Sequence, residues 1–230
     1  MNPVRPLHVG LMVPANNTTL EREMLGWLPP GSACTTVKIP RGDGLLTPET
    51  LPAYKGHALR LATTLIDRNV DVVAYGCTAA GFVAGPSADN ALADDLHRIT
   101  SRPVVTTARS MVLGLQEIGA RRIALVTPYA EAVNDRLKEF LADGGISVTS
   151  FASFYAENTD ALGRIQACEV AELAQRTMTR NCDSMFIACA QLPTFEVLEK
   201  LQAEFERPVL SSNRSIVSRV MRAAVDALNE

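Results

Sequence analysis

Short runs of apolar, often β-branched residues alternate with longer stretches in which apolar residues recur every three or four positions. The short runs are typical of buried strands, and the longer stretches of amphipathic helices. Strands are predicted over residues 7–13, 33–39, 70–75, 103–106, 121–128, 146–154 and 184–188. Helices are predicted from about 20, over 47–68, 88–99, 109–118, 130–142, 167–180 and 194–205, and lastly up to about 228. This alternation predicts an α/β fold in which helices cover mainly parallel sheets.

Two of the helix starts are marked by their residue types. Asn17-Thr18-Thr19 offers N-cap side chains, and Glu21 and Glu23 follow in the first turn, where the helix dipole favours acidic residues. Thr47-Pro48-Glu49 combines a capping threonine with a proline at the first helical position, which predicts a helix start at this point.

The pattern of the first half of the chain returns in the second half. Leu11-Met-Val-Pro14 matches Leu125-Val-Thr-Pro128, and Arg102-Pro-Val-Val-Thr-Thr107 matches Arg207-Pro-Val-Leu-Ser-Ser212. Because both pairs are separated by about half the chain, we infer an internal duplication. The prediction is two pseudo-symmetric α/β lobes, residues 1–112 and 113–230, with the last helix packing back on the first lobe.

A third matching pair carries the candidate chemistry. Asp71–Phe82 and Asp183–Pro193 each contain a short apolar run that is followed by a cysteine, Cys77 in the first and Cys189 in the second. Ligands of open parallel sheets bind beyond the carboxyl ends of the strands. A pseudo-twofold axis would bring the two strand ends together, so we expect both cysteines to face one small-molecule site at the lobe interface.

Composition narrows the range of partners. The 230-residue chain is 47% hydrophobic and 20% charged, with a net charge of −3 and no block of basic residues, which argues against nucleic acid or a membrane surface as a partner. No signal-peptide pattern and no apolar run of about 20 residues is present, and a cytoplasmic location is expected.

The cysteines and histidines do not predict a metal site. The five cysteines include no CxxC pair and the three histidines are scattered, which favours free thiols over disulfides or zinc. Cys34, Cys168 and Cys182 are expected to be small buried side chains without a chemical role.

Several segments resemble one enzyme superfamily. Val13-Pro-Ala-Asn-Asn-Thr-Thr19, Tyr75-Gly-Cys77, Val126-Thr-Pro-Tyr129 and Cys189-Ala-Gln-Leu-Pro193 are similar to segments of maleate cis-trans isomerases. Ala15-Asn16 departs from the Ser-Ser usual there. The chain also resembles arylmalonate decarboxylase, a second member of the aspartate/glutamate racemase superfamily. Those matches are Leu46-Thr-Pro-Glu49, Gly76, Thr78, Phe82, Tyr129 and Val133-Asn134.

The resemblance implies an active site and a function. Its implied catalytic residues are Cys77 and Cys189, and it implies no metal and no organic cofactor. It implies a small carboxylate substrate and a homodimer or homotetramer. The implied substrate-binding residues are Asn17, Thr78, Tyr129, Asn158, Ala190 and Gln191.

Two cysteines favour the isomerase, because the decarboxylase keeps a cysteine only in its second lobe. We expect a helix N-terminus to lower the pKa of each thiol. One thiolate would then add to maleate, the former double bond would rotate, and elimination would release fumarate. Two alternatives remain open: a decarboxylase or racemase that works through an enediolate, and a non-catalytic carboxylate-binding protein.

Overall fold

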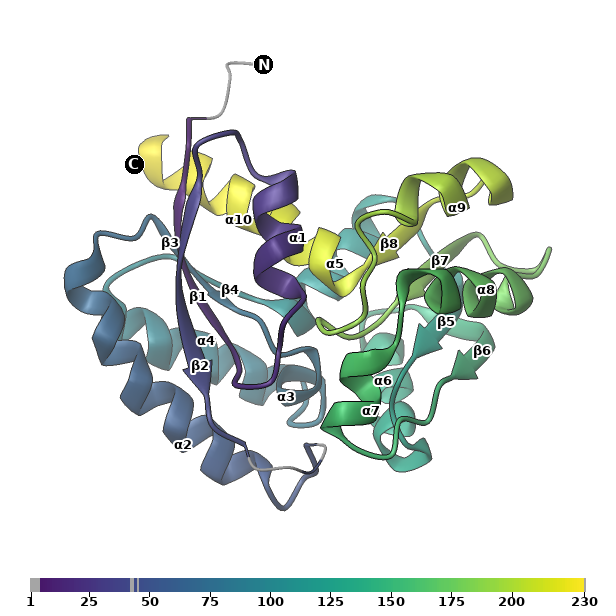
Figure 1. Ribbon diagram of the computed structural model, residues 1–230, viewed down its shortest axis with the longest axis horizontal. Helices are drawn as coiled ribbons and strands as arrows, with labels where there is room; N and C mark the ends of the chain where they lie inside the picture. Colours follow the sequence, from purple (N-terminus) through teal and green to yellow (C-terminus); the bar gives the residue numbers. More distant parts are fainter. Residues whose placement is uncertain (1–4, 42–43, 45, 230) are drawn as a thin grey trace.

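The computed structural model describes residues 5–41, 44 and 46–229, and shows two α/β lobes side by side (Figure 1). Within the described residues, each lobe holds a four-stranded sheet in which every pair of neighbouring strands is parallel. The first sheet contains β1 (His8–Pro14), β2 (Ala33–Ile39), β3 (Val72–Tyr75) and β4 (Val104–Thr106). The second contains β5 (Arg122–Thr127), β6 (Ser147–Ser153), β7 (Ser184–Ile187) and β8 (Val209–Ser211).

The strand order is the same in both lobes. It is β2-β1-β3-β4 in the first and β6-β5-β7-β8 in the second, so each strand has an equivalent in the other lobe. The predicted fold of two related parallel sheets flanked by helices is therefore confirmed. β3 and β7 are buried along their whole length, as expected for inner strands of sheets covered on both faces.

Helices connect the strands of both lobes (Figure 1), and the described part of the first lobe also contains a 3₁₀ segment. In the first lobe they are α1 (Leu20–Trp27), α2 (Leu51–Ala62), η1 (Thr63–Arg68), α3 (Thr78–Phe82), α4 (Pro86–Thr100) and α5 (Thr107–Glu117). In the second lobe they are α6 (Glu131–Asp143), α7 (Thr159–Arg164), α8 (Ala167–Thr177), α9 (Leu198–Phe205) and α10 (Ser212–Asn229).

The predicted helix start at Thr47-Pro48-Glu49 is wrong by about one turn. Thr47 accepts a backbone hydrogen bond from Leu51, where α2 begins, and the side chains of Thr47 and Thr50 lie 3.4 Å apart in a turn. Pro52 supplies the proline of the first helical turn instead. The short helices α3 and α7 were not predicted, because five or six residues are too few to show helical periodicity.

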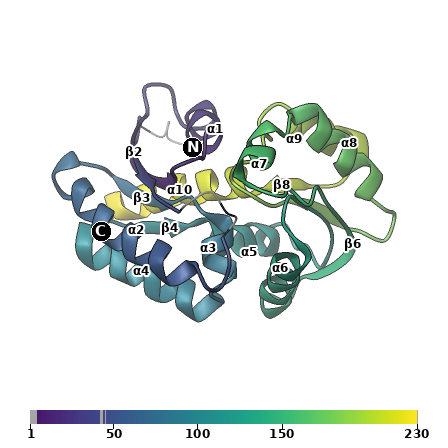
Figure 2. The same ribbon diagram turned by 60° about the horizontal axis from the view of Figure 1, so that its bottom comes forward.

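The last helix joins the two lobes. α10 starts at the end of β8 and runs across to the first lobe, where it packs on α5, α1, β3 and β4 (Figure 1 and Figure 2). The division of the chain at residue 112 stays a prediction. Among the described residues, no helix has both the length and the apolar content needed to cross a lipid bilayer.

Candidate active site

Both predicted catalytic cysteines line one cavity of about 110 Å³ between the lobes. Sites for drug-sized ligands occupy about 300–1,000 Å³, so this cavity fits a molecule of only a few heavy atoms. A larger hollow of about 580 Å³, beside Glu23 and Phe195, contains neither cysteine. The residues that line the cysteine cavity are Pro14, Asn16, Asn17, Arg41, Leu46, Thr47, Gly76, Cys77, Thr78, Ala79, Tyr129, Ala130, Val133, Leu162, Cys189, Ala190 and Gln191.

Cys77 follows β3 and is the N-cap residue of α3. Its side chain is buried, and it has extended backbone torsions with φ −127°. Burial raises the pKa of the Cys77 thiol, while the backbone N–H of Ala80, the charge of Arg41 and the hydroxyl of Tyr54 act in the opposite direction. The N–H groups at the start of α3 lower the pKa of Cys77, as expected, but the loss of hydration raises it by more.

Cys189 occupies the equivalent place after β7, but no helix begins there. Residues 190–197 are turns, a bend and irregular backbone, and α9 begins only at Leu198. The backbone of Cys189 has φ +123°, which is uncommon for a residue with a side chain. Its N–H donates to the Ser212 hydroxyl at 3.0 Å, and its sulfur accepts the Gln191 N–H at 3.5 Å.

The expectation of thiols with lowered pKa values is wrong for both cysteines. Burial raises the pKa of the Cys189 thiol too, against the opposing effects of the Gln191 N–H and the Tyr129 hydroxyl. A thiolate in a dry cavity loses its hydration, so without a bound molecule the protonated form is favoured. The backbone N–H groups of Ala80 at Cys77 and of Gln191 at Cys189 are therefore not enough to stabilise a thiolate at neutral pH.

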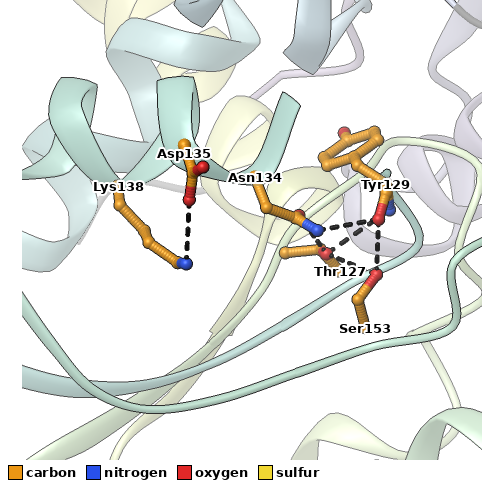
Figure 3. A network of polar contacts seen from close by, with 6 residues as sticks. All are labelled: Thr127, Tyr129, Asn134, Asp135, Lys138 and Ser153. Atoms are coloured by element: carbon orange, nitrogen blue, oxygen red, sulfur yellow. Dashed lines mark hydrogen bonds and ion pairs between the residues drawn. The ribbon is translucent and has the colours of Figure 1, made fainter. Parts of the chain in front are cut away.

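The ring of Tyr129 packs edge-to-face against the ring of Phe82 in the first lobe, and the two ring centroids are 5.5 Å apart. Its backbone carbonyl accepts hydrogen bonds from the Asn134 amide and the Ser153 hydroxyl, both at 2.7 Å. Figure 3 shows that this network holds the main chain of Tyr129 while its ring points away from the network. The buried Tyr129 hydroxyl lacks a hydrogen bond of good geometry to any described residue, so it is available to a ligand.

The other predicted binding residues connect the lobes at the cavity wall. The Asn17 side chain accepts from the N–H groups of Thr19, the N-cap residue of α1, and of Leu20, so it caps the helix start from two residues further back. It also donates to the Ala190 carbonyl at 3.0 Å. The Gln191 side chain bonds the backbone N–H and the hydroxyl of Thr18, each at 3.0 Å. Their positions beside the cavity fit the prediction, and part of their hydrogen-bonding capacity is used by the interface.

Thr78 is buried next to Cys77, and its hydroxyl donates to Ser212 at 3.1 Å. Ser212 therefore contacts the cysteine segments of both lobes, since it also accepts the Cys189 N–H. The sequence pattern grouped Ser212 with Thr107, and the structure gives the two residues equivalent places at helix starts.

Asn158 is the predicted site residue that the structure does not bring to the cavity. It is exposed, and its side-chain oxygen accepts the Ala161 N–H at 2.8 Å, which makes it the N-cap of α7. An amide that completes a helix start in this way satisfies a local backbone donor. The cavity lining gives no support to a binding role for Asn158, and that role stays a prediction.

Arg41 and Tyr54 belong to the site but were not predicted. Arg41 lines the cavity, and the Tyr54 hydroxyl is buried near Cys77. A signal for Arg41 was present, because it stands two residues beyond the carboxyl end of β2, the same kind of place that singled out the cysteines. Tyr54 gave no such signal, because it lies within α2.

The free cysteines outside the cavity have different surroundings. Cys182 is buried, as expected, and Cys34 is partly buried, with burial raising its pKa to about 12. Cys168 is exposed, which contradicts the expectation of burial. No group of three or more His, Cys, Asp or Glu side chains suited to a metal ion occurs in the part of the chain that the structure describes.

A family model described as arylmalonate decarboxylase matches residues 41–229. The chain belongs to the arylmalonate decarboxylase family. A maleate isomerase from Geobacillus stearothermophilus is 27% identical over 94% of this chain and 90% of its own length. An arylmalonate decarboxylase from Bordetella bronchiseptica is 28% identical over 75% and 72% of the two chains.

Solved structures share the fold of this arylmalonate decarboxylase family member. A maleate isomerase variant from Pseudomonas putida S16 with maleate has a TM-score of 0.88 and 23% identity, and covers 96% and 93% of the chains. A Nocardia farcinica maleate isomerase variant with a covalently bound succinylcysteine intermediate has a TM-score of 0.88 and 24% identity, with 96% and 94% coverage. The chain is an enzyme with similarity to maleate isomerases.

Proposed function

We propose that the enzyme is a cofactor-independent cis-trans isomerase that converts a small cis-dicarboxylate, maleate, to fumarate. The observation that carries the proposal is that Cys77 and Cys189, at equivalent strand ends of two related lobes, line one small cavity. The match to maleate isomerases over most of the chain supports the same reading.

In the proposed reaction the Cys77 thiolate adds to one alkene carbon. A C–S bond forms, and the π electron pair moves to the neighbouring carbon and its carboxylate. The Cys189 thiol protonates that carbon, and the former double bond, now single, rotates. Cys189 then removes the proton, the alkene re-forms, and the Cys77 thiolate leaves. Covalent addition replaces one high rotational barrier with several lower ones, and no net oxidation or reduction occurs.

The remaining cavity residues have proposed binding roles. The Tyr129 hydroxyl, which has no hydrogen bond of good geometry to a described residue, and the second N–H of the Asn17 amide are proposed donors for a carboxylate. The backbone amides at Ala190 and Gln191, with Thr78, complete the polar wall beside the two thiols. The homodimeric or homotetrameric state stays a prediction.

The test is proton NMR of the purified protein with maleate in deuterated buffer. We expect a fumarate signal without added metal or cofactor, and complete loss of turnover in Cys77→Ser and Cys189→Ser. Cys168→Ser is the matched control, since Cys168 is exposed and outside the cavity, and it should keep full activity. Unchanged maleate with the wild-type protein, or near-normal turnover in either cavity variant, would contradict the scheme.

A decarboxylase is the second candidate. It is favoured by the family model and by the apolar side chains of Leu46, Val133 and Leu162 in the cavity wall, which a dicarboxylate without substituents does not need. In that reaction Cys189 would protonate an enediolate formed by loss of carbon dioxide. Consumption of phenylmalonate, with one solvent deuterium at the product α-carbon and no maleate turnover, would select this candidate.

A further inference from the structure

Arg41 is the one charged side chain among the described residues that line the cysteine cavity. All the other lining side chains are neutral amides, hydroxyls, thiols or apolar groups. The cavity therefore has a positive balance of formal charge, although the whole chain has a net charge of −3. A cavity with an excess of positive charge favours the binding of anions.

Among the residues that the structure describes, the guanidinium of Arg41 has no counter-ion. Within the described residues it forms no ion pair, and its Nε and Nη2 atoms are buried without a hydrogen-bond partner. An arginine cannot escape this cost by losing its proton, because it stays charged at all ordinary pH values. Arg41 as a whole is partly buried, but N–H donors that are removed from water without a partner carry a free-energy cost. An anionic ligand would supply the missing partner.

We propose that Arg41 is a catalytic residue that binds one carboxylate of the substrate beside the two thiols. The inference rests on the proposed function for the identity of the substrate, and on the cavity itself for the anion site. A guanidinium presents parallel N–H donors whose spacing matches the two oxygens of a carboxylate. The family resemblance implied a carboxylate contact at Asn158, and this proposal assigns such a contact to Arg41.

In this proposal, Arg41 assists the reaction of the two thiols as well as the binding of the substrate. Its charge acts on both Cys77 and Cys189, and lowers the pKa of each thiol against the effect of burial. When a thiolate adds to the alkene, the electron pair passes into the adjacent carboxylate, which becomes more negative. A fixed cation at this carboxylate stabilises that state more than the ground state, and so contributes to kcat as well as to KM.

The first experiment measures anion selectivity without using turnover. Each protein is treated at one pH with iodoacetate and, separately, with iodoacetamide, and alkylation of Cys77 and Cys189 is followed by peptide mass spectrometry. The two reagents alkylate the same thiolate, so the ratio of their rates reports the attraction of the carboxylate. The variants are Arg41→Gln and Arg41→Lys, with Arg60→Gln as the control on the exposed side of α2.

Loss of a charge-assisted carboxylate contact corresponds to roughly a ten- to hundredfold change. We expect the iodoacetate-to-iodoacetamide ratio to fall by that factor in Arg41→Gln, to fall less in Arg41→Lys, and to stay unchanged in Arg60→Gln. An equal ratio in wild type and Arg41→Gln would overturn the proposal, whether or not maleate is turned over. A falling ratio without maleate turnover would support the anion site and overturn only the proposed substrate.

A second measurement separates binding from a structural role. Without ligand, Arg41→Gln should have a Tm equal to or above that of wild type, because it removes a charge whose buried N–H donors have no partner among the described residues. Succinate, which has two carboxylates and no double bond, should raise the Tm of wild type and Arg60→Gln but not that of Arg41→Gln. A clearly lower Tm of unliganded Arg41→Gln would assign Arg41 to the fold and overturn the proposal.

Discussion

At the scale of single residues, the two cysteines differ although their strands are equivalent. Cys77 has an ordinary extended backbone, while Cys189 has φ +123°, a region in which glycine is the usual residue. Such a conformation costs on the order of 1–3 kcal/mol and persists where the surroundings determine it. A side chain retained at this position is consistent with a chemical use for its thiol.

The pH dependence of thiol reactivity follows from burial. The charged or titratable groups that interact with Cys77 among the described residues are Arg41, Tyr54, Tyr75, Tyr129 and Cys189. Arg41 and Tyr54 lower the pKa of the Cys77 thiol, and burial outweighs them. Because a thiol reacts only after it has lost its proton, alkylation of Cys77 by neutral iodoacetamide should rise with pH. Its midpoint should lie above the value of about 8.5 for a free cysteine.

The measurement is the alkylation rate of the Cys77 peptide between pH 6 and 11, with the peptide of exposed Cys168 followed in the same samples as a reference for reagent consumption. Arg41→Gln should move the Cys77 midpoint to still higher pH, since it removes a charge that favours the thiolate. A midpoint at or below that of a free cysteine in the wild-type protein would contradict the effect assigned to burial.

At the scale of elements, the short helix α3 positions Cys77 by close packing. A Cβ atom on Gly81 would lie 2.4 Å from the Cβ of Ala108 on α5 and 2.6 Å from a carboxylate oxygen of Asp89 on α4. The absence of a side chain at Gly81 therefore lets α3 approach both helices. The same approach holds the N-terminus of α3, and with it Cys77, at the cavity.

Replacing Gly81 by alanine should destabilise the protein by about 1–3 kcal/mol, the usual cost of an overpacked core. Activity should fall as well, because α3 must shift. Gly56→Ala is the matched control: Gly56 lies inside α2, and the nearest atom to its Cβ would be an Arg60 nitrogen at 3.5 Å. It should stabilise the protein by roughly 0.5–1 kcal/mol through helix propensity. Urea unfolding of both variants measures the change in the free energy of unfolding, which should be negative for Gly81→Ala and positive for Gly56→Ala.

At the scale of the whole molecule, a buried carboxylate of the first lobe holds the second. Glu23 on α1 is 2% exposed and accepts hydrogen bonds from the Thr194 N–H and hydroxyl, the Phe195 N–H and the Asn213 amide, at 2.5, 2.8, 2.9 and 2.7 Å. The rings of Trp27 and Phe195 also pack against each other across the interface, with their centroids 4.9 Å apart. This contact fixes the distance between the lobes whose strand ends form the cavity.

Glu23→Gln should be strongly destabilising, by roughly 3–5 kcal/mol, because an amide N–H₂ would face the donors that the carboxylate now satisfies. Glu21→Gln is the matched control in the same helical turn, where the side chain is only partly buried, and should cost no more than about 1 kcal/mol. Equal urea midpoints for Glu23→Gln and Glu21→Gln would contradict the role given to Glu23.

The sequence alone determined the repeating parts of this protein. Alternating strand and helix periods, the matched segments of the two halves and the cysteines at Cys77 and Cys189 predicted a duplicated α/β fold with one shared site, since strand ends of parallel sheets meet at one edge. The capping contact of Asn17 was predicted from its residue type, whereas its place at the site was implied by the family resemblance.

The tertiary structure decided which loop side chains share the cavity and how the thiols ionise. Arg41 lines the cavity, and its Nε and Nη2 atoms have no hydrogen-bond partner in the described part of the chain, whereas the Asn158 side chain caps its own helix. Neither arrangement follows from local periodicity. The rise in the pKa of the Cys77 and Cys189 thiols depends on how completely both lobes exclude water. Burial and charge at a site between lobes are sums over contacts distant in sequence, which no single stretch of the chain contains.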